Sequence, residues 1–486
     1  MSFLSCSKPH PPNIVFILAD DLGWKDLGCY GSEFYETPNL DRLAQEGMRF
    51  TDAYASACVC SPTRASLLTG KSSARLHLTD WLPGRPDRPS QRLHRPNFQT
   101  FLPKEEHTLA ETLKEKGYAT ACIGKWHLGE ATETWPEHQG FDLNIAGSGK
   151  GNPASYFSPY GLPNLADGPA GEYLTDRITD EALRFLDKNK DNPFFLYLPH
   201  YAVHTPLQAK GDLVEKYRAK AGSISGEKKA EFLSDLGCSV RQVQNQPTYG
   251  AMVESMDKSV GRILEKLAEL GIEKNTIVFF TSDNGGLSTA EGSPTSNLPL
   301  RGGKGWPYEG GVRVPLIVRW PGMTKAGSIS SHPVISADLY PTILQMVGLL
   351  PRQKEITDGV SFIPAIKGEK QTENPLFWHY PHYSNQGGAP YGAVRLGNWK
   401  LIEWYEDKRL ELYDLKADLG EKNNLALKKP EKTASLVTLL HDWRQRVDAQ
   451  MPTDNPLKAK LGYPLRDGGF ARKGFNLWDP SIIKVG

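Results

Sequence analysis

One cysteine of this chain lies at the predicted start of a helix. In the segment 60–70 (CSPTRASLLTG), Pro62 suits the first turn of a helix and Gly70 suits its end, so Cys60 is expected at the helix N-terminus. Unpaired backbone amides there stabilise an anion, either a thiolate or a bound oxyanion, and Arg64 can face the same charge. A buried structural cysteine on a capped helix is the alternative, since free cysteine is among the most buried residue types.

Two short polar clusters carry only oxygen and amide groups. Asp20 and Asp21 follow one apolar run, and Asp283 and Asn284 follow another. Carboxylate and amide oxygens are the ligands that Ca²⁺ prefers, whereas zinc favours imidazole or thiolate. Together the clusters predict a calcium site, with a helix cap and a turn as the alternative for each cluster taken alone.

Basic and imidazole side chains follow further apolar runs. Lys125 and His127 come after one run and His204 after another, while Lys304 lies in a glycine-rich segment. Fixed cations stabilise charge on a transferring group, and imidazoles move protons. With the acidic pairs 20–21 and 283–284, four predicted strands thus carry charged or imidazole side chains just after their carboxyl ends. This is the edge where open α/β sheets place ligand sites.

The elements that must position these residues alternate between strand-like runs and helical stretches. This alternation predicts the α/β class, with a large, mostly parallel sheet sandwiched by helices. Strands are expected at 13–18, 118–123, 194–198, 276–281 and 316–319, and helices at 37–48, 60–70, 109–116 and 252–270.

The pattern changes after about residue 370. Residues 391–403 and 410–415 are expected to form a small antiparallel sheet, and 434–449 a helix with one apolar face. We therefore predict an N-terminal tail (1–12), a catalytic α/β domain (13–370), a small C-terminal domain of antiparallel sheet plus helix (371–450), and a tail on the surface (451–486).

The composition excludes several classes of protein. The 486 residues include 57 Lys and Arg against 56 Asp and Glu, a net charge of +1, which gives no overall field for nucleic acid or an anionic membrane surface. The longest apolar run, 14–19, is far shorter than the roughly 18 residues of a membrane span. The six cysteines form neither a disulfide framework nor a zinc pattern.

The segment 60–70 resembles the signature of the sulfatase family, the formylglycine-dependent, arylsulfatase-type members of the alkaline phosphatase superfamily. In that family the signature cysteine is converted to formylglycine after translation. The resemblance extends over residues 12–450, where further blocks stand in the expected order: 20–21 (DD), 124–129 (GKWHLG), 204–206 (HTP), 282–285 (SDNG), 301–304 (RGGK), 309–315 (EGGVRVP) and 412–415 (LYDL).

The resemblance implies a mechanism. The hydrated aldehyde at position 60 would attack sulfur, Asp283 would receive its proton, His204 would protonate the leaving oxygen, and His127 would act as the base that regenerates the aldehyde. The implied catalytic residues are Cys60, Arg64, Lys125, His127, His204 and Lys304, and the implied calcium ligands are Asp20, Asp21, Cys60, Asp283 and Asn284.

The segment 378–383 (WHYPHY) resembles bacterial sulfatases of the N-acetylgalactosamine and galactose group. This implies a sulfate ester on a galactose-type unit of a glycan. The candidate sugar-binding residues are His77, Asp80, Arg85, His379 and His382. A packed domain junction is the alternative for the last two, because aromatic and imidazole groups are common in both settings.

Two other functions stay open: a phosphonate or phosphate monoester hydrolase of the same superfamily, and an unmatured protein that binds sulfated glycans. The zinc-ligating histidines of most phosphatase relatives are absent from the polar clusters. The expected partners are a sulfated saccharide and a formylglycine-generating or sulfatase-maturating enzyme, without nucleic acid or a membrane span. We expect a periplasmic or secreted location with the leader absent from this chain, and a cytoplasmic location as the alternative.

Overall fold

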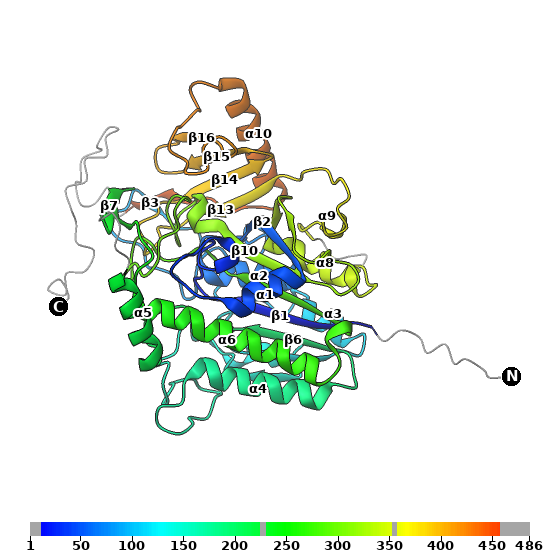
Figure 1. Ribbon diagram of the computed structural model, residues 1–486. Helices are drawn as coiled ribbons and strands as arrows, with labels where there is room; N and C mark the ends of the chain where they lie inside the picture. Colours follow the sequence, from blue (N-terminus) through cyan, green and yellow to red (C-terminus); the bar gives the residue numbers. More distant parts are fainter. Residues whose placement is uncertain (1–10, 224–229, 352–356, 457–486) are drawn as a thin grey trace.

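A nine-stranded sheet forms the centre of the molecule in the computed structural model, which describes residues 11–223, 230–351 and 357–456 (Figure 1). The strand order is β11-β2-β10-β9-β1-β6-β4-β5, and β12 also pairs with β2. The strands β9 (Thr276–Ser282), β1 (Asn13–Ala19), β6 (Phe194–Pro199), β4 (Ala119–Ile123) and β5 (Leu143–Ile145) run parallel. Beyond β9 the sheet is mixed, because β10 (Arg313–Arg319) is antiparallel to both β9 and β2 (Met48–Tyr54). The short strands β11 (Ser328–Ser330) and β12 (Val334–Ile335) pair with β2 in parallel.

Helices cover both faces of this sheet. One face packs against α1 (Pro38–Glu46), α4 (Leu174–Asn189), α5 (Gly211–Ser223) and α6 (Pro247–Glu269). The other packs against α2 (Cys60–Thr69), α3 (Leu109–Lys114), α8 (Leu339–Met346) and α9 (Ile363–Ile366). Along β1, Val15 and Ile17 enter the first core and Ile14 and Phe16 the second, as the two-residue period of a strand requires. The predicted α/β sandwich is confirmed.

A second, four-stranded sheet follows α9. It is antiparallel and consists of β13 (Leu376–Tyr380), β14 (Tyr391–Leu396), β15 (Trp399–Trp404) and β16 (Leu410–Asp414). One face packs against α10 (Pro430–Arg446), which lies over it at the top of Figure 1. The opposite face presents aromatic residues such as Trp378 to Tyr54, Trp306 and Tyr308 of the large unit. The small sheet is therefore joined to the large one by an apolar, aromatic junction.

Minor elements complete the described chain. The pairs β3 (Leu93–His94) with β17 (Thr453–Asp454) and β7 (Phe232–Asp235) with β8 (Cys238–Arg241) are antiparallel, and α7 (Glu309–Val312) is a single turn before β10. No helix of the described residues has the length and apolar character needed to cross a membrane. Of the predicted tails, 1–10 and 457–486 lie outside the described residues.

The structure corrects one boundary. Met48 was expected on the buried face of a helix, yet α1 ends at Glu46 and Met48 begins β2. The two elements meet at Gly47, where a Cβ atom would lie 2.5 Å from the carbonyl oxygen of Val318. The close approach of β10 therefore ends the helix and sends the chain into the sheet.

Candidate active site

Four strands of the large sheet end at one site. Asp20 and Asp21 follow β1, and Asp283 and Asn284 follow β9. These strands are parallel neighbours with Ala19 opposite Ser282, so both polar pairs leave the sheet at the same level. The loop after β6 continues the pairing, because the amide of Val203 donates to the carbonyl oxygen of Asp20 at 2.7 Å. The topology thus brings His204 beside the acidic pairs.

Lys125 reaches the same edge through a glycine. Gly124 follows β4 with φ of 128°, and a Cβ atom there would lie 2.0 Å from the carbonyl oxygen of Pro199. Only glycine permits this conformation and approach. The turn lets the amide of Lys125 donate to Pro199 at 2.7 Å, and the side chain of Lys125 is fully buried.

Cys60 is the first residue of α2, as predicted. All ten residues of α2 are buried, and Cys60 is 2 % exposed. Arg64, one turn on, donates through Nε and Nη2 to Oδ2 of Asp283 at 2.9 and 2.7 Å, and through Nη1 to the carbonyl oxygen of Lys125 at 2.8 Å. Arg64 therefore connects the N-terminus of α2 to the ends of β9 and β4.

The other two cations are paired with the aspartates that follow β1. Lys125 Nζ lies 2.6 Å from Oδ2 of Asp20, and Lys304 Nζ lies 2.8 Å from Oδ2 of Asp21. Burial raises the pKa of Asp20. It also raises that of Asp21, but there Lys304 and His204 outweigh it and hold the pKa well below its usual value. The site contains three buried cations within a frame of carboxylates.

His127 has a defined tautomer. Its Nε2 lies 2.6 Å from the carbonyl oxygen of Leu82, which only accepts, so Nε2 carries the proton. The other nitrogen, Nδ1, lies 3.4 Å from Sγ of Cys60. Burial and Lys125 lower the pKa of His127 well below its usual value, so the ring is neutral and directs a lone pair at residue 60. The Leu82 carbonyl is a backbone group, so its contact with His127 could not be predicted from a sequence motif.

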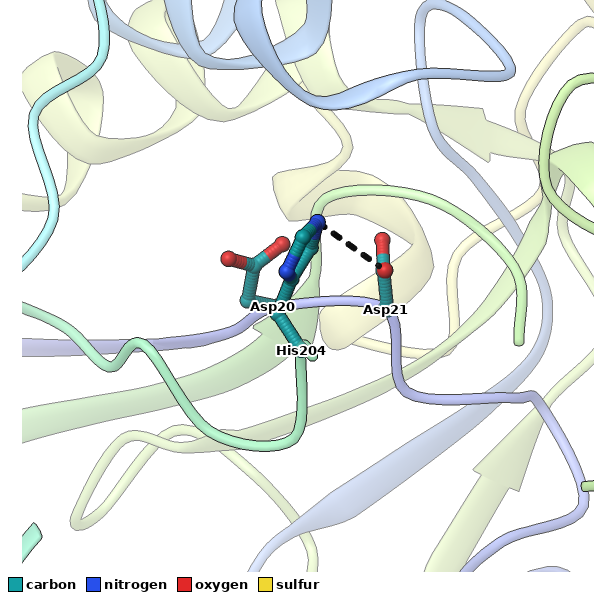
Figure 2. Close-up of side chains that lie close together, drawn as sticks. All are labelled: Asp20, Asp21 and His204. Atoms are coloured by element: carbon teal, nitrogen blue, oxygen red, sulfur yellow. Dashed lines mark ion pairs between the residues drawn. The ribbon is translucent and has the colours of Figure 1, made fainter. Parts of the chain in front are cut away.

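In Figure 2 the imidazole ring of His204 lies between the side chains of Asp20 and Asp21, the acidic pair that follows β1. Its Nδ1 is 2.8 Å from the carbonyl oxygen of Thr205, which places the proton of the neutral ring on Nδ1. Its Nε2 faces Oδ2 of Asp21 at 3.5 Å. Burial and Lys304 lower the pKa of His204 to about 4. In the neutral ring Nε2 is therefore the unprotonated nitrogen, and a proton taken up there would be stabilised by Asp21.

The acidic pairs also have the character of a cation site. The amide nitrogen of Asn284 donates to Oδ1 of Asp21 at 2.8 Å, which fixes the orientation of the amide. Its oxygen, and Oδ1 of Asp20, are buried and have no hydrogen-bond partner among the residues that the structure describes. Ligand atoms of Asp20, Asp21 and His204 lie within 4.8 Å of one another. A buried oxygen without a partner costs free energy, and a cation bound to these two oxygens would remove that cost.

The five predicted sugar-binding residues lie where the segment 77–85 meets the small sheet. Three bond to backbone carbonyl oxygens there: His77 to Asp448 at 2.9 Å, His379 to Gln450 at 2.9 Å and Arg85 to Ser384 at 2.8 Å.

The remaining two candidates form a buried pair. Oδ2 of Asp80 lies 3.9 Å from Nδ1 of His382, Asp80 accepts from Tyr380 at 2.8 Å, and both residues are at most 2 % exposed. Burial raises the pKa of Asp80 to about 6. These contacts favour the packed junction for the histidines, and sugar binding by the five residues stays a prediction.

This chain is similar to known proteins over most of its length. The family model described as Sulfatase matches residues 12–349, and the model described as N-sulphoglucosamine sulphohydrolase, C-terminal, matches 303–450. A protein named Sulfatase from Formosa agariphila is 33 % identical over 93 % of this chain and 88 % of its own length. N-acetylgalactosamine-6-sulfatase of Canis lupus familiaris is 36 % identical over 82 % of this chain and 73 % of its own length. The crystal structure of Ps i-CgsB in complex with k-i-k-neocarrahexaose superposes with a TM-score of 0.74 and 31 % identity, covering 91 % of this chain and 94 % of that chain.

Proposed function

The chain belongs to the sulfatase family, whose enzymes hydrolyse sulfuric esters, and from this premise we propose that it removes a sulfate monoester from a galactose or N-acetylgalactosamine unit of a sulfated glycan. The observation that carries the proposal is the convergence of Arg64, Lys125 and Lys304 on a site that also holds Cys60 and His127. The names of the similar proteins, one an N-acetylgalactosamine-6-sulfatase and one crystallised with a neocarrahexaose, support a glycan of this type.

The donor set fits a calcium ion. The unsatisfied oxygens belong to Asp20 and Asn284, and Asp21 and Asp283 add carboxylates, so oxygen ligands dominate as calcium requires. A cation bound there would supply positive charge beside the sulfate oxygens and favour ionisation of a hydroxyl at residue 60.

We also propose that Cys60 is matured to formylglycine. A hydrated aldehyde would supply two hydroxyls on one carbon, whereas a thiol offers one sulfur that cannot expel the sulfate it has bound. His127 suits this residue, because its unprotonated Nδ1 faces position 60 from 3.4 Å. It would accept the proton released when the second hydroxyl collapses to the aldehyde.

The remaining side chains act on the sulfate and the leaving group. Arg64, Lys125 and Lys304 would hold the sulfate oxygens and stabilise charge that develops on them, at no cost of reorganisation because each is already fixed by a carboxylate. His204 would protonate the leaving sugar oxygen from Nε2. The negative charge of a bound sulfate raises the pKa of His204 and so favours its protonated form.

The test compares matched sulfate and phosphate esters of one saccharide, together with mass spectrometry of residue 60. We expect turnover of the sulfate ester by protein that carries formylglycine, and at least about a hundredfold loss of kcat in His204→Ala, as for other general acids. Preferred turnover of the phosphate ester would overturn the assignment in favour of a phosphomonoesterase. Glycan binding without turnover by protein matured at Cys60 would leave only a binding protein.

A further inference from the structure

An exposed acidic side chain lies in the same inter-strand segment as Lys304, between β9 and α7. Glu291 lies in the loop between β9 and α7, is exposed, and has φ of 53° beside Gly292. Burial lowers the pKa of Lys304, but Asp21 and then Glu291 raise it well above its usual value, and Glu291 also acts on His204. The geometry agrees, because Gln386, which bonds to Glu291, also packs against Gly305, the residue next to Lys304.

This carboxylate is held in place by the small sheet. Gln386, in the loop between β13 and β14, donates its side-chain amide to Oε1 of Glu291. Its own backbone oxygen accepts from Trp306 Nε1 at 3.0 Å and Thr289 Oγ1 at 3.2 Å. Gln386 is 4 % exposed, so both its backbone and its side chain are fixed.

The orientation of the Gln386 amide is set by Glu291. A carboxylate only accepts, so the NH₂ group must face it, and the amide oxygen turns toward Gly305, the neighbour of Lys304. That oxygen is buried and finds no hydrogen-bond partner in the described part of the chain. An ideal Cβ at Gly305 would lie 2.6 Å from it. The amide thus leaves one of its own atoms unsatisfied while it holds Glu291.

A fixed negative charge is unfavourable at the mouth of a site for anions. It repels any sulfate that approaches, and it also repels a second anionic group on the same sugar ring. It becomes favourable when the group beside the scissile ester is a hydrogen-bond donor, because a carboxylate is a strong acceptor. The hydroxyls of a sugar ring next to the sulfated carbon are such donors.

We propose, on the basis of the function proposed above, that Glu291 determines specificity by accepting hydroxyl hydrogens from the sugar ring that carries the scissile sulfate. Gln386 is its positioning residue. The enzyme then selects rings with a single sulfate and rejects rings with a second sulfate or a carboxylate beside it. No residue of the acidic pairs or of α2 is needed for this choice.

The experiment measures kcat/KM for a monosulfated and a disulfated form of the same galactose-type disaccharide. The proteins are the wild type, Glu291→Gln, Gln386→Ala, and Glu431→Gln as a control at an exposed acid on α10. Glu291→Gln keeps the shape of the side chain and removes its charge. We expect it to shift the ratio of the two kcat/KM values toward the disulfated form by roughly ten- to a hundredfold, the scale of a hydrogen bond to a charged group. Gln386→Ala should shift the ratio in the same direction by less, and Glu431→Gln should leave it unchanged.

The outcomes separate the two proposals. A wild type that hydrolyses neither saccharide contradicts the proposed function and, with it, this specificity. A wild type that hydrolyses both, with a ratio that Glu291→Gln leaves unchanged, upholds the function and overturns the role of Glu291. A ratio altered by Glu291→Gln but not by Gln386→Ala overturns the positioning role. Since Glu291 is exposed, loss of folding does not obscure the result.

Discussion

Two clusters of buried charge in this molecule differ in whether their acceptor oxygens have a cation or a hydrogen-bond donor beside them. The strand-edge cluster consists of Asp20, Asp21, Arg64, Lys125 and Lys304. The junction cluster consists of Glu309 of α7 with Lys400 of β15 and Glu421. Every residue of both clusters is at most 5 % exposed.

The junction cluster is closed. Lys400 Nζ lies 2.9 Å from Oε1 of Glu309 and 3.0 Å from Oε1 of Glu421. Tyr54 donates to the second oxygen of Glu309 at 2.7 Å, and the amide of Glu309 donates to the second oxygen of Glu421 at 2.7 Å. Each carboxylate oxygen thus lies within 3.0 Å of a cation or a donor, although Oε1 of Glu421 has only the ion pair with Lys400 and no hydrogen bond from the described residues. The cluster joins the two sheets.

The strand-edge cluster is open by comparison. Among the described residues, Oδ1 of Asp20 and the amide oxygen of Asn284 have no hydrogen-bond partner. His127 faces Cys60 at the start of the helix that Arg64 joins to Asp283. Burial of charge is therefore a property that a structural cluster and a candidate active site share. Unsatisfied acceptors next to proton-transfer groups distinguish the second from the first.

The largest effect should come from breaking the closed cluster. Lys400→Met leaves two buried glutamates facing each other, and we expect it to lower the free energy of unfolding by about 3–5 kcal/mol, as for one partner removed from a buried ion pair. Denaturant unfolding measures the loss. A change below about 1 kcal/mol would contradict a structural role for this cluster.

The same substitution in the open cluster should act on turnover. Lys304→Met removes a cation assigned to the sulfate, and we expect kcat to fall by about 10²–10³, the usual size for a lost charge-stabilising group. The loss of unfolding free energy should be smaller than in Lys400→Met, because His204 and Asn284 still contact Asp21. A variant with full kcat and a large loss of stability would reverse the comparison.

Removal of the metal should destabilise only the open cluster. With calcium at about a hundred times its Kd, binding to the folded state contributes about 2.7 kcal/mol of stability, which a chelator removes. We expect a lower thermal midpoint and loss of turnover on chelation, both restored by calcium. In Asp20→Ala the chelator should leave the midpoint unchanged, whereas an equal shift in that variant would place the cation elsewhere.

The most gradual effect is a pH dependence of the closed cluster. Burial, against Lys400, raises the pKa of Glu421 to about 7, while Lys400 and Arg313 outweigh burial and lower that of Glu309 to about 2. Between the usual carboxyl pKa of about 4.3 and pH 7, the folded state holds a proton on Glu421 that the unfolded state releases. Stability should therefore fall as pH rises through this window, by up to about 1.4 kcal/mol per pH unit.

Glu421→Gln tests this dependence directly. The amide imitates the protonated carboxyl, so the variant should resemble the wild type near pH 4.5 and lose the decline toward pH 7. Denaturant unfolding across this range measures both curves. An unchanged slope would assign the pH dependence to another group.

The strand ends were predictable from sequence because each apolar run stops abruptly at a charged or imidazole residue. The runs before Asp20, Lys125 and Asp283 all became parallel strands of one sheet. By contrast, β2 (Met48–Tyr54) mixes buried and half-buried positions, and Met48 also fits the helical spacing from Ala44. Only contact with β10 decides between the two, and that contact is not local in sequence.

The candidate site was predictable as far as side-chain chemistry reaches. Aspartate, lysine and histidine at strand ends can be recognised as candidate site residues from their type. The Leu82 carbonyl that orients His127 is a backbone atom, so residue type does not indicate it. Gln386 is an ordinary glutamine in a loop, and its meeting with Glu291 depends on how the small sheet docks. His77 and His379 are the opposite case: their residue type suggests sugar binding, the fold gives them backbone partners that the sequence does not indicate, and their role stays a prediction.

The complete burial of α2 has a consequence for the order of events in biosynthesis. Cys60 is 2 % exposed, and no residue of its helix reaches the surface. An enzyme that oxidised this cysteine would need an accessible form of a side chain that the folded protein buries. Once β9, β4 and α2 have been joined through Arg64, that form is lost. The maturation proposed for Cys60 would therefore compete in time with folding, and rapid folding before the modification would yield a native but inactive protein.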